Sequence, residues 1–413
     1  MKSRMDRMRN ATHGKHGLTR RALLTGTLGA AAAALPAGHA SAQAARPDSA
    51  TRPGRLPNEL GARSPAEQPK RLPSPTSSRT PLQDLHGTIT PADLHFERHH
   101  GGVAVVDPAT YRLLVHGLVE RPATFTLDDL KRFPAASRIC FLECSGNLVR
   151  TGGEQTTAQA LCGLTSQSEW TGVRLATVLR ETGARPQATW CLAEGQDAAL
   201  MTRSIPLKEV LEEAMLVYAQ NGEALRPEQG YPVRLLLPGF EGNSSVKWLR
   251  RLELADQPFM TREETSRYTD PLADGTARQF SFVMDARSII TSPSYPQDVR
   301  PGWVEIRGLA WSGRGRIQRV DVSTDRGATW RASELQGPVL PKAHTRFRLL
   351  WRWDGAPTEI LSRAVDESGY VQPEWTALDA ARGRRTRYHL NPITGWKVGA
   401  DGRVLFGIER VSA

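Results

Sequence analysis

Between residues 82 and 259, short apolar segments alternate with polar ones at no fixed period. Residues 111–116 have the pattern of a strand, and Thr126 is a suitable N-cap for a short helix that begins at Leu127. Residues 233–237 form an apolar run between two prolines, interrupted only by Arg234, which indicates a buried strand. Because these elements are not spaced as repeated β-α-β units, the pattern predicts an α+β domain rather than a doubly wound sheet.

From about residue 282 to residue 378 the pattern changes to segments in which apolar and polar positions alternate. Residues 304–311 and 317–322 alternate apolar and polar side chains, and shorter strand-like runs follow at 347–353 and 360–365. Several short strands separated by turns predict a β-sandwich of the immunoglobulin type. We therefore expect one domain over residues 81–262, a sandwich over 280–383 and a C-terminal extension over 384–413.

The first 80 residues have a different composition. A basic start leads through Arg20-Arg21 into an Ala/Gly-rich apolar stretch and then to Ala40-Ser41-Ala42, a signal-peptidase pattern. We interpret residues 1–42 as a twin-arginine signal, which exports folded proteins to the periplasm, with an ordinary secretory signal as the alternative. The apolar stretch is shorter than the roughly twenty residues that cross a bilayer, so no membrane span is expected. Residues 43–80 contain seven prolines and are predicted to be a disordered spacer.

The net charge of +11 is concentrated in the same N-terminal part. Residues 1–80 contain fourteen Lys and Arg against four Asp and Glu, which leaves the remainder of the chain at +1. A nucleic-acid-binding protein needs a basic face on its folded domain, so no nucleic-acid partner is predicted.

Several common cofactor motifs do not occur in the sequence. It contains no C-x-x-C-H haem attachment site, no four-cysteine iron–sulfur run, no H-E-x-x-H zinc motif and no complete Gly-rich phosphate loop. If the protein is a redox enzyme, its electrons must therefore pass to another chain.

The four cysteines, Cys140, Cys144, Cys162 and Cys191, allow one or two disulfides in an exported protein. Cys140 and Cys144 lie four residues apart in a predicted strand, about 13 Å, which is too far for a disulfide. Cys144 ends this strand and begins Ser-Gly-Asn, where a thiol presented to a cleft can bind a soft metal. From the residues alone, a metal ligand, a disulfide and a buried thiol all remain possible for Cys144.

Six motifs in order across residues 85–380 resemble the sulfite oxidase family of molybdopterin enzymes. The resemblance implies a molybdopterin-binding catalytic domain followed by an immunoglobulin-like dimerisation domain. Segments 201–206, 261–270 and 388–398 are most similar to the sulfane dehydrogenase subunits of thiosulfate-oxidising systems. The six motifs are FERHH (96–100), FLECSGN (141–147), WTGV (170–173), GYPVR (230–234), SVKWL (245–249) and RAVDE (363–367).

The resemblance also implies a set of site residues. Cys144 corresponds to the thiolate ligand of molybdenum, and Arg98 to the arginine that faces both substrate and pterin. The residues that correspond to pterin and phosphate contacts are His100, Asp197, Arg234, Ser245 and Lys247, with Gln229 standing where the family often has a histidine. Arginine, lysine and hydroxyl side chains are the donors that a phosphate requires.

Two departures from the family pattern concern the substrate pocket. Leu148-Val149 follow the Asn of the cysteine motif where many sulfite oxidases have two arginines, and an arginine comes only at Arg150. The family's active-site tyrosine is aligned with Met201. Both changes would remove polar groups from a sulfite pocket, so a protein-bound sulfane sulfur is the expected substrate.

The resemblance thus implies a periplasmic molybdenum–molybdopterin oxidoreductase without haem of its own. Its expected partners are a c-type cytochrome as electron acceptor, a sulfur-carrier protein as substrate donor and a second copy of the chain, paired through the immunoglobulin-like domain within a heterotetramer. The alternatives are a dehydrogenase for free sulfite and a non-catalytic exported binding protein whose cysteines form disulfides.

Overall fold

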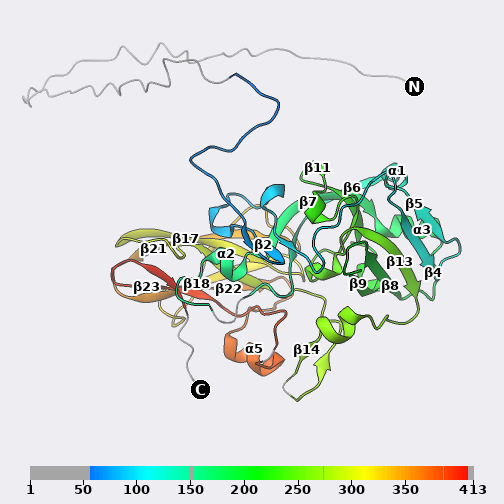
Figure 1. Ribbon diagram of the computed structural model, residues 1–413. Coiled ribbons are helices and arrows are strands. Elements are labelled where there is room, and N and C mark those ends of the chain that lie inside the picture. Colours follow the sequence, from blue (N-terminus) through cyan, green and yellow to red (C-terminus); the bar gives the residue numbers. More distant parts are fainter. Residues whose placement is uncertain (1–55, 149–151, 273, 385, 408–413) are drawn as a thin grey trace, which may run out of the picture. The chain divides into compact units, whose positions relative to one another are not determined.

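The computed structural model (Figure 1) describes residues 56–148, 152–272, 274–384 and 386–407. The expected twin-arginine signal lies outside the described residues. The chain divides into two units, residues 1–63 and residues 64–413, and residues 56–63 of the first unit are exposed. No helix within the described ranges is long and apolar enough to cross a bilayer.

The first domain of the second unit is built on two sheets. One has the strand order β11-β10-β7-β6, with β12 also paired to β10, and the other has the order β5-β4-β13-β8-β9. All pairs are antiparallel except β13 with β4. The strands are β4 (Leu113–Gly117), β5 (Ala123–Phe125), β6 (Ala135–Glu143), β7 (Thr165–Arg174), β8 (Trp190–Gly195), β9 (Thr202–Pro206), β10 (Met215–Gln220), β11 (Glu223–Ala224), β12 (Arg234–Leu236) and β13 (Leu249–Ala255).

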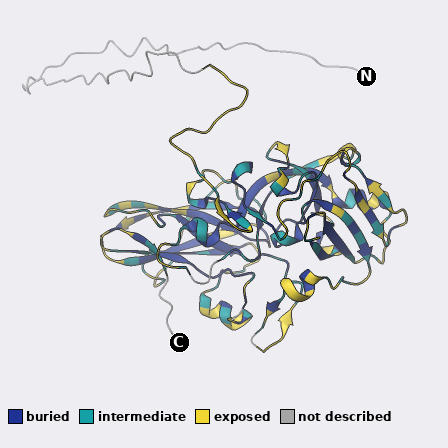
Figure 2. Cartoon of the chain, in the orientation of Figure 1, coloured by how far each residue is buried: buried dark blue, intermediate teal, exposed yellow. Residues whose placement is uncertain are grey.

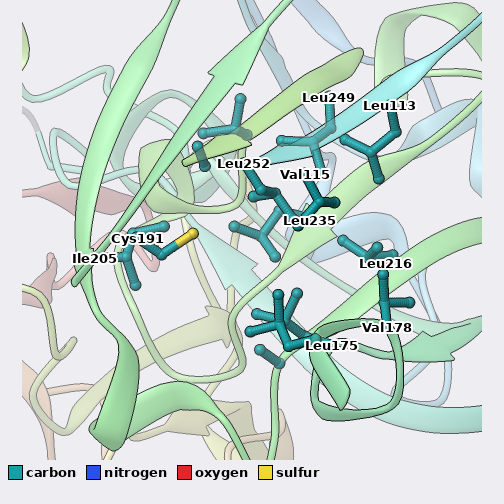
Figure 3. Packing of buried hydrophobic residues seen from close by; sticks show 14 of the residues in the cluster. Leu113, Val115, Leu175, Val178, Cys191, Ile205, Leu216, Leu235, Leu249 and Leu252 are labelled. Carbon is teal, nitrogen blue, oxygen red and sulfur yellow. The ribbon is translucent and has the colours of Figure 1, made fainter. Parts of the chain in front are cut away.

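Apolar side chains from both sheets pack into a shared core (Figure 3). Leu216 and Leu235 come from the first sheet, and Val115 and Leu252 from the second. The predicted strand at 233–237 is buried throughout, Arg234 included, and contains β12. Core burial of this kind contributes about 1.5–3 kcal/mol for each large apolar side chain.

The helices are few and short. Thr126 caps α1 as predicted, accepting a hydrogen bond from the backbone N–H of Asp129 while the Asp129 carboxylate accepts one from the Thr126 backbone. The helices are α1 (Leu127–Arg132), α2 (Ala158–Cys162), α3 (Leu175–Thr182), α4 (Leu207–Val210) and α5 (Trp375–Arg382), with a π-helical turn at Glu263–Arg267 and 3₁₀ turns at Leu82–Asp84, Ala92–Leu94, Pro227–Gln229 and Gly242–Ser244.

The second domain is the predicted β-sandwich. Its sheets have the strand orders β16-β17-β21-β20 and β19-β18-β22-β23-β24. The side chains that face each other between the two sheets form one buried core (Figure 2). Alternate residues of β21 are buried and exposed, as the sequence pattern requires. The strands are β16 (Arg287–Ser292), β17 (Gly302–Trp311), β18 (Ile317–Ser323), β19 (Arg331–Ala332), β20 (Glu334–Gln336), β21 (Thr345–Trp353), β22 (Thr358–Asp366), β23 (Gly395–Val398) and β24 (Val404–Phe406), and the hairpin β14 (Asp270–Pro271) and β15 (Ala277–Arg278) precedes them.

The spacer predicted over residues 43–80 ends earlier than expected. Strands β1 (Leu72–Ser74) and β2 (Ser77–Arg79) pair with each other, and β2 pairs with β3 (Glu97–Arg98). Thr80 is fully buried, and its hydroxyl lies 2.6 Å from that of Ser166. The prediction was wrong here because these strands are held by backbone pairing and polar contacts, which leave no apolar pattern in the sequence.

The C-terminal extension predicted over residues 384–413 is also more integrated than expected. β23 pairs with β22 and β24 pairs with β23, so the last described strands belong to the sandwich. Between α5 and β23, the backbone N–H of His389 donates to the carbonyl of Ser145, next to Cys144. The tail therefore contacts the loop that carries the candidate metal ligand.

Candidate active site

All eight site residues derived from the sequence line one cleft in the first domain. They come from β3 and its end, the turn after β6, the loop between β8 and β9, and the segment 229–247. These segments lie far apart in the sequence. The eight residues are Arg98, His100, Cys144, Asp197, Gln229, Arg234, Ser245 and Lys247.

Cys144 follows the last residue of β6 and is held by its backbone. Its N–H donates to the Leu164 carbonyl at 2.9 Å, and its own carbonyl accepts from the Asn147 N–H at 2.9 Å. Gly242 packs against the same strand, and a Cβ at that position would lie only 2.8 Å from the Glu143 carbonyl oxygen. Burial raises the pKa of the Cys144 thiol, while a hydrogen bond from the Gly146 backbone and the charge of Arg98 oppose the rise.

None of the four cysteines forms a disulfide. Cys140, Cys162 and Cys191 are buried, and burial raises the pKa of each thiol well above its ordinary value. Cys144 is the one cysteine among the residues lining the cleft. Of the three possibilities left open by the sequence, the disulfide is thus removed for Cys144.

Arg98, His99 and His100 follow one another along one wall of the cleft. The Arg98 guanidinium donates to the His99 carbonyl, and His100 Nε2 lies 2.8 Å from the Tyr268 hydroxyl in a hydrogen bond. Burial, with a smaller contribution from Arg98, lowers the pKa of His100 to about 4. His100 is therefore neutral at physiological pH.

Lys247 is a cation held by neutral groups. Its Nζ lies 3.2 Å from the Arg98 carbonyl, 3.0 Å from the Glu228 carbonyl and 2.8 Å from His99 Nδ1. His99 Nε2 in turn lies 2.7 Å from Glu97 Oε2. Burial, reinforced by Arg234, lowers the pKa of Lys247 well below its ordinary value.

Arg234 on β12 is a second cation of the same kind. Its guanidinium donates to the Gln229 carbonyl and side-chain oxygen and to the Ser245 carbonyl, and it lies over the Trp170 ring at 5.2 Å. Burial lowers its pKa to about 9. Gln229 is buried and donates to the Phe96 carbonyl at 2.9 Å, which joins it to the wall that carries Arg98.

Asp197 and Ser245 shape the backbone around these cations. Asp197 Oδ1 accepts from the Met201 N–H at 2.9 Å, and the Ser245 hydroxyl accepts from the Leu237 N–H at 3.0 Å. Met201 also lines the cleft and is 8% exposed.

Sequence reasoning singled out neither the phenol of Tyr268 nor the amide of Asn243, although both line the cleft. Placing the family's tyrosine at Met201 suggested a cleft without a phenol, yet Tyr268 lines it from the end of the π-helical turn. The signal for Tyr268 in the sequence is the segment 261–270, which contains it and carries part of the resemblance. Of the residues after the cysteine motif, Leu148 packs against the sandwich core, and Val149 and Arg150 lie outside the described residues.

The charges of the cleft favour an anionic ligand. Within the described residues, neither Arg234, which is buried, nor Lys247, which is half-buried, forms an ion pair with a carboxylate. A buried cation without a counter-charge is costly, so a phosphate or similar anion placed between them would be stabilised. The thiol of Cys144 in the same cleft can bind a soft metal.

Comparison with known protein families assigns both domains. Residues 100–263 match the oxidoreductase molybdopterin binding domain, and residues 278–395 match the Mo-co oxidoreductase dimerisation domain. The matched ranges correspond to the two-sheet domain with its cleft and to the β-sandwich.

Individual proteins show the same similarity. The chain is 34% identical to mitochondrial sulfite oxidase of Rattus norvegicus over 70% of the chain and 58% of that protein, and 33% identical to sulfite oxidase of Gallus gallus over 70% and 69%. It is 31% identical to NADH nitrate reductase of Ulva prolifera over 74% of the chain and 40% of that protein. The chain thus spans about half the length of the first of these curated relatives.

One solved structure is similar to this chain over nearly the full length of both proteins. The sulfane dehydrogenase SoxCD from Paracoccus pantotrophus matches with a TM-score of 0.79 and 44% identity, over 92% of this chain and 96% of that one. With both family domains present in order and relatives of this similarity, the chain belongs to the sulfite oxidase family of molybdopterin oxidoreductases.

Proposed function

We propose that this chain is the molybdenum-bearing subunit of a sulfane dehydrogenase, which oxidises sulfane sulfur bound to a carrier protein. The observation that carries the proposal is the 44% identity to the sulfane dehydrogenase of Paracoccus pantotrophus over 96% of that chain. The cleft supports it, because the expected metal ligand and the expected cofactor contacts meet there.

The residues of the cleft fit a molybdopterin cofactor. The phosphate of the cofactor would supply the negative charge that Arg234 and Lys247 lack, and Ser245 offers a hydroxyl beside them. His100, Asp197 and Gln229 would contact the pterin from the walls, and Cys144 would be the one protein ligand of the metal.

The bound cofactor would supply a metal that takes up two electrons while the sulfur gains an oxygen atom from water. Each oxygen added releases two electrons and two protons. Arg98 favours the thiolate form of Cys144 and places a positive charge where a sulfur oxyanion forms. The hydrogen-bonded pair of Tyr268 and His100, neutral at physiological pH, can hold a proton between Oη and Nε2.

Partners and location follow from the same proposal. Because the sequence has no C-x-x-C-H motif, the electrons would pass one at a time to a c-type cytochrome. A sulfur-carrier protein would bring the substrate, and the sandwich would pair two copies of the chain within a heterotetramer. Export of the folded protein by the twin-arginine route would place it in the periplasm.

Free sulfite is the second candidate substrate. The 33–34% identity to sulfite oxidases and the Tyr268 phenol in the cleft both favour it. Leu148-Val149 argue against free sulfite, because they stand after Asn147 where many sulfite oxidases have two arginines.

The two substrates are distinguished by cytochrome c reduction with purified holoenzyme. We expect a higher kcat/KM for carrier-bound sulfane than for free sulfite, and we expect Cys144→Ser to lose turnover with both. Cys191→Ser in the apolar core is the matched cysteine control and should keep activity. A higher kcat/KM for free sulfite would show that the enzyme is a sulfite dehydrogenase. Turnover in Cys144→Ser would refute the molybdenum mechanism.

A further inference from the structure

Glu143, the residue before Cys144, is a buried carboxylate that contacts the sandwich. It is 0% exposed at the end of β6, and its Oε2 accepts a hydrogen bond from Trp311 Nε1 of β17 at 2.7 Å. Its Oε1 accepts from the side-chain amide of Asn147 at 3.0 Å. A buried carboxylate next to a metal ligand requires a counter-charge.

Arg287, the first residue of β16, provides this counter-charge from the other domain. Its guanidinium forms an ion pair with Glu143 Oε1, and it is 3% exposed. It also lies over the Trp311 ring, with 5.9 Å between the guanidinium carbon and the ring centroid. Burial alone would lower the pKa of Arg287, yet the charge of Glu143 raises it above its ordinary value.

The guanidinium brackets the Cys144 turn from both sides. Before the turn it binds the Glu143 carboxylate, and after the turn it donates to the Asn147 carbonyl. Asn147 closes the turn itself, because its N–H donates to the Cys144 carbonyl and its Oδ1 accepts from the Leu164 N–H. One side chain of the sandwich thus fixes both ends of the loop that presents the thiol.

The pair also sets the local charge. Glu143 directly precedes Cys144 in the chain, and Arg287 compensates the negative charge of its carboxylate. We propose that the Glu143–Arg287 pair positions Cys144 from the sandwich and tunes the reduction potential of the metal that Cys144 binds. This inference rests on the proposed function, and it gives the sandwich a role in the active site besides dimerisation.

Removing either member of the pair alone should shift the reduction potential of the metal, and the two shifts should have opposite signs. A negative charge near a metal stabilises its oxidised state and lowers its potential. Arg287→Gln leaves Glu143 uncompensated and should lower the molybdenum potential, whereas Glu143→Gln leaves Arg287 uncompensated and should raise it. The double variant, with a neutral and still hydrogen-bonding pair, should return close to the native value.

The test is a redox titration of the holoenzyme followed by the EPR signal of molybdenum, with metal content and thermal midpoint measured on each variant. Arg363→Gln is the matched control, because Arg363 pairs with Asp321 within the sandwich sheet that contains β18 and β22. We expect opposite shifts in the single variants, reversion in the double variant and no shift in the control.

The outcomes separate the two proposals. Unchanged potentials, or shifts of one sign in both single variants, would overturn the role of the pair while leaving the molybdenum enzyme intact. A native protein that carries no molybdenum would instead overturn the proposed function. If either single variant fails to fold, the double variant decides, because a native EPR line shape and potential are expected from it and a displaced potential would refute the inference.

Discussion

Arg203 on β9 is predicted to be the most sensitive charged residue of the first domain. It is 0% exposed, and its guanidinium donates to Glu264 Oε1 at 2.7 Å and to Glu241 Oε1 at 2.8 Å. It also lies over the Tyr268 ring at 5.1 Å, so it supports the segment that brings this phenol to the cleft. Replacing it by methionine preserves the length of the side chain and removes both ion pairs.

The expected loss follows from the two carboxylates left behind. Removing one partner of a buried ion pair costs about 3–5 kcal/mol. The Glu264 carboxylate keeps a hydrogen bond from the Ser204 N–H, and Glu241 keeps those from Asn243 and His389, so we expect about 4 kcal/mol, within that range. At roughly 2 °C per kcal/mol for a unit of this size, the thermal midpoint should fall by about 8 °C.

The loss should also depend on pH. Burial raises the pKa of Glu241, but Arg203 and the other partners lower it more, so its net pKa lies below the ordinary value. Native Glu241 thus contributes stability that is present at neutral pH and lost as the pH falls through its folded pKa. Without Arg203 burial dominates and the pKa rises, so the difference between Arg203→Met and native protein should shrink from pH 7 to pH 4.

The assay is urea unfolding followed by tryptophan fluorescence at both pH values. Arg348→Met is the control, because its pair with Glu334 is exposed and should contribute nothing measurable. A difference below about 1 kcal/mol at pH 7, the range of an exposed pair, would refute the reasoning. So would a difference that does not shrink on acidification.

Three further predictions concern the fold. Thr126→Ala removes the capping box of α1 and should cost about 1 kcal/mol in denaturant unfolding, whereas Thr126→Ser should be near native. Leu113→Ala opens a cavity in a fully buried part of the core and should cost about 2–5 kcal/mol by the same measurement; a smaller loss would mean that the two sheets close over the cavity. Burial lowers the pKa of His344 to about 3, so its stabilising contribution is lost as the pH falls below its unfolded pKa, by up to about 1.4 kcal/mol per pH unit. His344→Gln should therefore flatten the decline of stability between pH 6 and pH 4, and an unchanged slope would contradict the assignment.

The parts of the fold that depend on local patterns could be predicted from the sequence. The mostly apolar run at 233–237 and the alternation within the sandwich indicate burial directly, and the Thr126 cap depends on a residue only three positions away. Strands β1 and β2 could not be predicted, because their partner β3 lies about twenty residues further along the chain and the paired strands are mostly polar.

The residues of the candidate site could be predicted where they lie within the motifs that resemble the family. Arg98, Cys144 and Lys247 were found by resemblance, since composition and spacing alone left Cys144 ambiguous. Tyr268 and Arg287 were missed because each acts across a contact of more than 140 residues in the sequence, to His100 and to Glu143. Such contacts leave no periodic signal, and only the folded chain brings them together.

The central claim is that the cleft around Cys144 holds a molybdenum cofactor. Elemental analysis by ICP-MS of protein purified from the periplasm of a molybdopterin-competent host tests it most directly. The account predicts about one molybdenum for each chain, since Cys144 is the one cysteine of the cleft. Folded protein from that host that carries no molybdenum would contradict it.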